Sequence, residues 1–90
     1  MNAEREDRVI QDAFDSEKLR KQTRLPLICI YDHPTDYPGH FVARVWDLNT
    51  PTRLVALSPT LEGIREHIPS GMARIPRSEH DDPHIVEVWI

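Results

Sequence analysis

The chain has 90 residues, of which 39% are hydrophobic and 29% charged, and its formal net charge of −4 at pH 7 disfavours nucleic acid as a partner. Its length suits a single domain with a thin core. The single cysteine, Cys29, excludes an internal disulfide and favours the reducing cytoplasm. Because the start of the sequence is charged, no secretory leader is expected, and because no long apolar run is present, no membrane span is expected.

Residues 1–24 are predicted to form a charged arm that is helical or partly disordered. They contain neither proline nor glycine, whereas all eight prolines and all three glycines lie in 25–90. Val9, Ile10 and Phe14 would share one apolar stripe on a helix. We therefore expect 1–24 to be an appendage and 25–90 to be a single α+β domain.

Four strands are expected in the rest of the chain. Residues 25–31 are nearly all apolar, as in a central strand that is buried on both faces. Residues 41–47 form a second strand, and a turn at 48–52 leads to a third at 53–57, so that these two would form a hairpin. Residues 85–90 would form the last strand.

One helix is predicted at 59–68. Ser58 is suited to its N-cap, with Thr60 as the alternative, and apolar residues recur at helical spacing behind them. A short edge strand is expected at 72–75. Together these elements predict an α+β fold in which a mainly antiparallel sheet of about four strands carries the helix on one face, beside the N-terminal helical arm.

The sheet face opposite the helix is a candidate binding surface. Alternation along the second and fourth strands places a β-branched residue, a charge and a tryptophan on this face of each strand. The partner-binding candidates are Arg44, Trp46, Glu87 and Trp89, together with Tyr37 in the loop beside them. Three interpretations stay open: the arm covers this face or Arg44 pairs with Glu87, a second copy of the chain covers it, or a foreign protein binds there.

Two clusters of acids and histidines form a second candidate site. The residues concerned are Asp32, His33, Asp36 and His40 after the first strand, and His80, Asp82 and His84 before the last. If those strands pair in antiparallel fashion, the clusters share one rim of the sheet. They could then hold a divalent metal that activates water, although such residues also serve as turn formers or as a pH-sensitive surface. No phosphate-binding glycine loop or nucleophile motif is present, and we expect no resident cofactor.

Three stretches, 30–38, 41–47 and 81–90, resemble a family of short bacterial proteins that is associated with mobile elements and has no assigned activity. That resemblance implies no catalytic residue. The order of three strands and a helix, with Thr60-Leu61-Glu62 at the helix start, is similar to HicB-type antitoxins, which implies a toxin or RNA partner.

These observations favour a non-enzymatic protein-interaction or regulatory module of a bacterial accessory protein. It would act as a homo-oligomer or with a protein partner. The alternatives are a small metal-dependent hydrolase built on the two clusters and a HicB-like antitoxin that binds a toxin or RNA.

Overall fold

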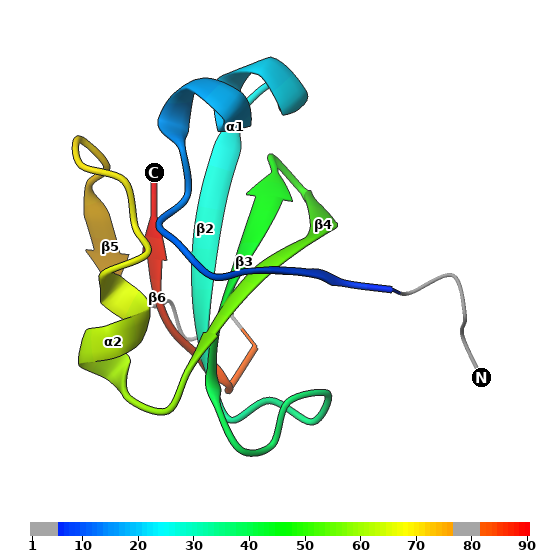
Figure 1. Cartoon of the computed structure of the whole chain (residues 1–90), viewed down its shortest axis with the longest axis vertical. Coiled ribbons are helices and arrows are strands. Elements are labelled where there is room, and N and C mark those ends of the chain that lie inside the picture. Colours follow the sequence, from blue (N-terminus) through cyan, green and yellow to red (C-terminus); the bar gives the residue numbers. More distant parts are fainter. Residues whose placement is uncertain (1–5, 77–81) are drawn as a thin grey trace.

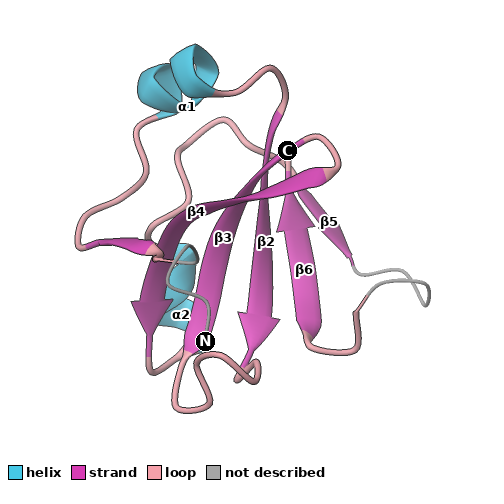
Figure 2. Cartoon of the chain, turned by 90° about the vertical axis from the view of Figure 1, so that its right-hand side faces the viewer, coloured by secondary structure: helices cyan, strands magenta, loops and turns pink. Residues whose placement is uncertain are grey.

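The computed structural model describes residues 6–76 and 82–90. Within these residues the elements follow in the order β1 (Arg8–Ile10), α1 (Ser16–Gln22), β2 (Pro26–Asp32), β3 (Phe41–Asp47), β4 (Thr50–Ser58), α2 (Leu61–Arg65), β5 (Arg74–Pro76) and β6 (Ile85–Trp89). The strands form one twisted sheet in the order β1-β4-β3-β2-β6-β5 (Figures 1 and 2). Helix α2 lies on one face of this sheet, and α1 lies at one end.

The described sheet has six strands and is mixed, so the expectation of a mainly antiparallel sheet of about four strands is wrong. Strand β1 pairs with β4 in parallel, with Val9 opposite Val55, whereas every other neighbouring pair is antiparallel. Strands β1 and β5 each have three residues, too few for hydrophobic alternation to distinguish a strand from a loop. The short edge strand expected near 72–75 is present as β5.

Much of the predicted pairing in the centre of the sheet is confirmed. Strands β3 and β4 form the expected antiparallel hairpin, and β6 lies antiparallel beside β2. The turn between β3 and β4 contains Leu48 in the left-handed region, with φ of 58°. Its N–H donates to the carbonyl oxygen of Leu25, which fixes the turn against the start of β2.

The N-terminal segment, which was expected to be a helical or partly disordered arm, contains a short strand as well as a helix. Residues 8–10 extend along β4, and the helix begins only at Ser16. Asp15 caps this helix, because its Oδ1 accepts hydrogen bonds from the N–H groups of Glu17 at 2.9 Å and Lys18 at 3.3 Å. The N-cap residue Asp15 therefore sets the start of the helix. The apolar stripe that the sequence suggested from Val9 to Phe14 does not set it.

This N-terminal segment packs into the main core. Phe14 and Leu19 are buried in one cluster with Ile28, Ala43 and Ile64, which lie on β2, β3 and α2. The N–H of Phe14 also donates to the carbonyl oxygen of His67 at 2.8 Å, just beyond α2. The segment thus contributes apolar surface to the face of the sheet that α2 covers.

Helix α2 is shorter than the predicted 59–68. Thr60 is the N-cap, and its Oγ1 accepts a hydrogen bond from Gly63 N–H at 3.0 Å. After Arg65 the N–H groups bond to carbonyl oxygens three residues back, a tighter pattern that ends the α-helix before Pro69. No helix in the described part of the chain has the length and apolar character needed to cross a membrane.

Candidate functional site

The two charged side chains expected on one sheet face lie on opposite faces. Cys29 is paired with both Arg44 and Val88, whereas Ile30 is paired with Ala43 and Glu87. Since directly paired residues share a face, Arg44 lies away from α2, while Glu87 faces the same side as the core residues Ile30 and Ala43. A register shift between Ile30 and Tyr31 causes this difference. The Arg44–Glu87 pair, which was one of the interpretations left open for this face, is therefore wrong.

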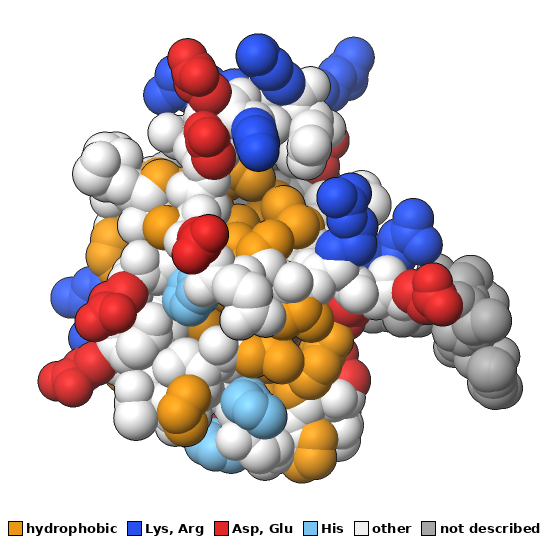
Figure 3. All heavy atoms as spheres, in the orientation of Figure 1, with side chains coloured by type: hydrophobic (Ala, Val, Ile, Leu, Met, Phe, Trp, Pro, Cys, Tyr) orange, Lys and Arg blue, Asp and Glu red, His pale blue; other side chains and the backbone are white. Residues whose placement is uncertain are grey.

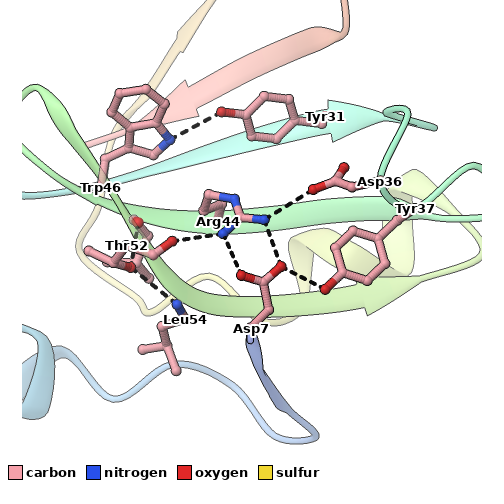
Figure 4. A network of polar contacts seen from close by, with 9 residues as sticks. Asp7, Tyr31, Asp36, Tyr37, Arg44, Trp46, Thr52 and Leu54 are labelled. Atoms are coloured by element: carbon pink, nitrogen blue, oxygen red, sulfur yellow. Dashed lines mark hydrogen bonds and ion pairs between the residues drawn. The ribbon is translucent and has the colours of Figure 1, made fainter. Parts of the chain in front are cut away.

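Arg44 is the centre of a polar network on the face away from α2 (Figure 4). Its two terminal nitrogens bond to the two carboxylate oxygens of Asp7, each at 2.9 Å. Nη1 also donates to the carbonyl oxygen of Thr52 at 2.7 Å, and Nη2 reaches Asp36 at 3.3 Å. The Arg44 and Asp7 side chains are only 7% and 10% exposed. The pair thus anchors the segment before β1 to the centre of the sheet.

Two tyrosines lie near Arg44, and only Tyr37 is bonded to its network. Tyr37 donates its hydroxyl hydrogen to Asp7 at 2.7 Å, and the hydroxyl oxygen of Tyr31 accepts from the indole N–H of Trp46 at 3.1 Å. Figure 4 shows the Tyr37 ring on the loop side of Arg44 and the Trp46 ring on the opposite side. Tyr31, Arg44 and Trp46 therefore form a row of large side chains across β2 and β3.

A cleft of about 600 Å³ opens over Arg44. Its walls come from the segment before β1, the 33–40 loop and the turn before β6. The residues that line it are Asp7, Tyr31, Pro34, Thr35, Asp36, Tyr37, Val42, Arg44, Asp82 and His84. The 33–40 loop that forms part of the cleft lies at the opposite end of the molecule from α1 (Figure 1), where Lys and Arg side chains gather (Figure 3).

The pKa values in the cleft are set by burial and by Asp7. Burial opposes the charge of Arg44, but the hydrogen bonds and negative charge of Asp7 bring its pKa above the ordinary value. Burial raises the pKa of Tyr31 to about 12. Burial, together with the hydrogen bond to Asp7, also raises the pKa of Tyr37 to about 12. Both tyrosines are therefore neutral hydrogen-bonding groups near pH 7.

The described members of the two acid–histidine clusters meet at one rim of the sheet, as the antiparallel pairing predicts. The N–H of Asp32 donates to the carbonyl oxygen of His84 at 2.7 Å. Within each cluster the side chains form local pairs, His33 with Asp32 and His84 with Asp82. His80 lies outside the described residues. Among the residues that are described, no group of three or more acids, histidines or cysteines could hold a metal ion.

The predicted site residues therefore divide into three groups. Those in the cleft are Tyr37, Arg44, Asp36, Asp82 and His84, and Trp46 joins them through Tyr31. Asp32 at the end of β2 and His33 and His40 in the adjoining loop do not line the cleft. Glu87 and Trp89 belong to the opposite face, where the indole N–H of Trp89 donates to Glu87 at 2.9 Å.

Two important residues of the cleft were missed by the sequence analysis. Tyr31 could have been found, because alternation along β2 places it with Cys29 on the face opposite Ile30. Asp7 had no such signal, since it lies in a charged stretch and reaches Arg44 only because β1 pairs with β4.

Comparison with protein families, with curated proteins and with solved structures finds no match for this chain.

Proposed function

We propose that this protein is a non-enzymatic protein-interaction module whose cleft over Arg44 receives a basic side chain of a partner protein. The observation that carries the proposal is the charge of the cleft lining. Asp7, Asp36 and Asp82 supply three carboxylates, and Arg44 supplies one guanidinium group. Together these four groups make the described lining negative by two charges, which favours a cationic group over an anionic one.

The hydrogen-bonding groups also support binding of a basic side chain. Asp36 is 52% exposed and is bonded to Arg44 at the long distance of 3.3 Å, so its carboxylate is accessible at the cleft rim. The Asp82 side chain is exposed to a similar extent. Carboxylates in such positions suit the planar fork of an arginine or the ammonium group of a lysine. Tyr31 and Tyr37 add aromatic surface to the lining, of the kind that is enriched at binding hot spots.

The chemistry of the lining supports recognition more than catalysis. A tyrosine whose pKa is about 12 is a poor general base near neutrality. The Asp7 carboxylate receives two hydrogen bonds from Arg44 and one from Tyr37, so it is committed to holding the network together. These groups are well placed to define the shape of the cleft, while the exposed acids select the ligand.

A nuclear magnetic resonance titration of the full chain with short blocked peptides tests this proposal. An arginine-containing peptide should shift the backbone signals of Asp36, Tyr37 and His84 in a saturable manner, whereas a peptide with glutamate in its place should not. Asp36→Asn should weaken binding about two- to fivefold, because an exposed ion pair is worth less than about 1 kcal/mol. Glu66→Gln removes the same charge from the region of α2 and serves as the matched control.

The proposal fails if both peptides shift the same backbone signals in the same way. It also fails if Asp36→Asn weakens peptide binding no more than Glu66→Gln does. A second copy of the chain is the competing occupant, because α1 presents Lys18, Arg20 and Lys21. Light scattering distinguishes the two cases: a monomer that binds the arginine peptide supports a foreign partner. A dimer that Asp36→Asn dissociates would overturn the foreign partner in favour of self-association.

A further inference from the structure

A second polar cluster lies on the opposite face of the sheet, beneath α2. At its centre is Glu87, which is 1% exposed. Arg65 holds both carboxylate oxygens of Glu87, through Nε at 2.9 Å and through Nη2 at 2.7 Å. The indole N–H of Trp89 donates to the same carboxylate at 2.9 Å. These three short hydrogen bonds satisfy Glu87 without any contribution from a second arginine.

Arg74 is the second arginine of this cluster, and it makes none of these three hydrogen bonds. It lies on the edge strand β5, where it is paired with Trp89 on β6. Its Nη1 is 3.8 Å from Glu87, which is close enough for charge attraction but too long for a hydrogen bond. Its side chain is 56% exposed. Among the described residues, the Arg74 guanidinium therefore has donors that no short hydrogen bond uses.

Arg65, Arg74 and Trp89 together line an open pocket of about 250 Å³. The two guanidinium groups and the buried carboxylate of Glu87 together carry one excess positive charge, and the carboxylate of Glu62 on α2 acts on Arg65 from beside them. The pocket is thus opposite in sign to the cleft over Arg44 and lies on the other face of the sheet. It would hold a small group such as a phosphate or a carboxylate, with the Trp89 ring as one wall.

We propose that Arg65, Arg74 and Trp89 form a binding site for the oxyanion of a small phosphate- or carboxylate-bearing ligand. Arg74 supplies the main contact, because guanidinium groups bind such oxyanions through paired N–H donors. Arg65 supplies the donors that Glu87 does not use, and Glu87 holds Arg65 and Trp89 in position. Glu87 is thus a positioning residue that does not touch the ligand.

The site is tested by titrating the isotope-labelled full chain with inorganic phosphate, phenyl phosphate and benzoate at constant ionic strength. The reporter is the indole N–H signal of Trp89, which a Trp46→Phe variant assigns by elimination. At least one probe should shift that signal in a saturable manner. Phosphate and benzoate are separate arms that tell a phosphate ligand from a carboxylate ligand, and saturation by either supports the site.

Variants then locate the contact. Arg74→Gln should raise the dissociation constant about tenfold or more, since a hydrogen bond to a charged group is worth about 1.5–3 kcal/mol. Arg74→Lys should retain part of the affinity, and Arg20→Gln, which removes an arginine from α1, should leave binding unchanged. The proposal is overturned if no probe saturates the Trp89 signal, or if Arg74→Gln binds as tightly as Arg20→Gln. Either result would leave the cleft over Arg44 unaffected.

Discussion

Arg44 and Glu87 are the two charged side chains that the described sheet buries most completely. Each is paired with an opposite charge from a different part of the fold: Arg44 with Asp7 before β1, and Glu87 with Arg65 on α2. A buried charge is costly unless it is paired and hydrogen-bonded, so each pair fixes how its two segments must sit. The two pairs therefore place one polar cluster on each face of a thin sheet.

Glu87 makes stability depend on acid pH. Its hydrogen bonds to Arg65 lower its pKa below the ordinary 4.5, and burial opposes this only in part. The unfolded chain then binds a proton at a higher pH than the folded chain does. The stabilisation by Glu87 is therefore complete above about pH 4.5 and is lost as the pH falls through the lower folded pKa.

Urea unfolding between pH 7 and pH 3 measures this effect. We expect Glu87→Gln to be clearly less stable than the natural chain at pH 7 and the difference to shrink as the pH falls below about 4.5. Glu66→Gln, which removes an exposed carboxyl group near α2, controls for the general change in charge. A Glu87→Gln deficit that stays constant across the whole range would contradict the prediction.

Helix α2 depends on close packing against the end of β4. Gly63 allows this approach, because a Cβ added there would overlap Oγ of Ser58 and lie 3.0 Å from Oγ1 of Thr60. Thr60 Oγ1 is the acceptor that caps α2, so a methyl group at Gly63 would disturb the cap as well. A glycine that lowers helix propensity is thus explained by its neighbours in space.

Gly63→Ala is therefore expected to lower the free energy of unfolding, although alanine favours a helix by about 1 kcal/mol over glycine. Steric overlap in a packed site costs about 1–3 kcal/mol, which exceeds that gain. The double variant Ser58→Ala with Gly63→Ala removes the overlapping hydroxyl group and should recover part of the loss relative to Ser58→Ala alone. Urea unfolding of the three variants measures these differences, and a Gly63→Ala chain as stable as the natural one would refute the argument.

The elements that could be predicted from the sequence are those with a strong local signal. The apolar run at 25–31 and the alternating residues at 41–47 correspond closely to β2 and β3. The three residues of β1 carry no such signal, because their conformation depends on pairing with β4, more than forty positions away. The shift in register beside Ile30 is also invisible locally. That shift moved Glu87 and Trp89 out of the predicted face and so divided one expected site into two.

At the scale of the whole molecule, the N-terminal segment links both faces of the sheet. Asp7 reaches Arg44 on one face, while Phe14 and Leu19 fill the core beneath α2 on the other. The sequence suggested an appendage because its charged residues dominate the composition of 1–24. Its few apolar side chains decide where it packs, and their partners lie far away in the chain.

We expect that residues 25–90, once the N-terminal segment is removed, no longer form a domain that unfolds in one cooperative transition. Losing Phe14 and Leu19 from the core costs about 1.5–3 kcal/mol for each side chain, and leaving Arg44 buried without Asp7 costs about 3–5 kcal/mol. The total is comparable with the whole stability of a small domain, about 5–15 kcal/mol. Calorimetry and urea unfolding of the 25–90 chain, compared with a chain that starts at Glu6, measure the loss.

Adding Arg44→Met to the 25–90 chain separates the two contributions. An apolar side chain removes the charge that has lost its bidentate partner Asp7, so this variant should regain part of the stability, but the gap left by Phe14 and Leu19 should keep it below the chain that starts at Glu6. If the 25–90 chain unfolds with the same midpoint and cooperativity as that longer chain, the N-terminal segment is an appendage after all. The wall that Asp7 contributes to the cleft would then have no structural role in the rest of the fold.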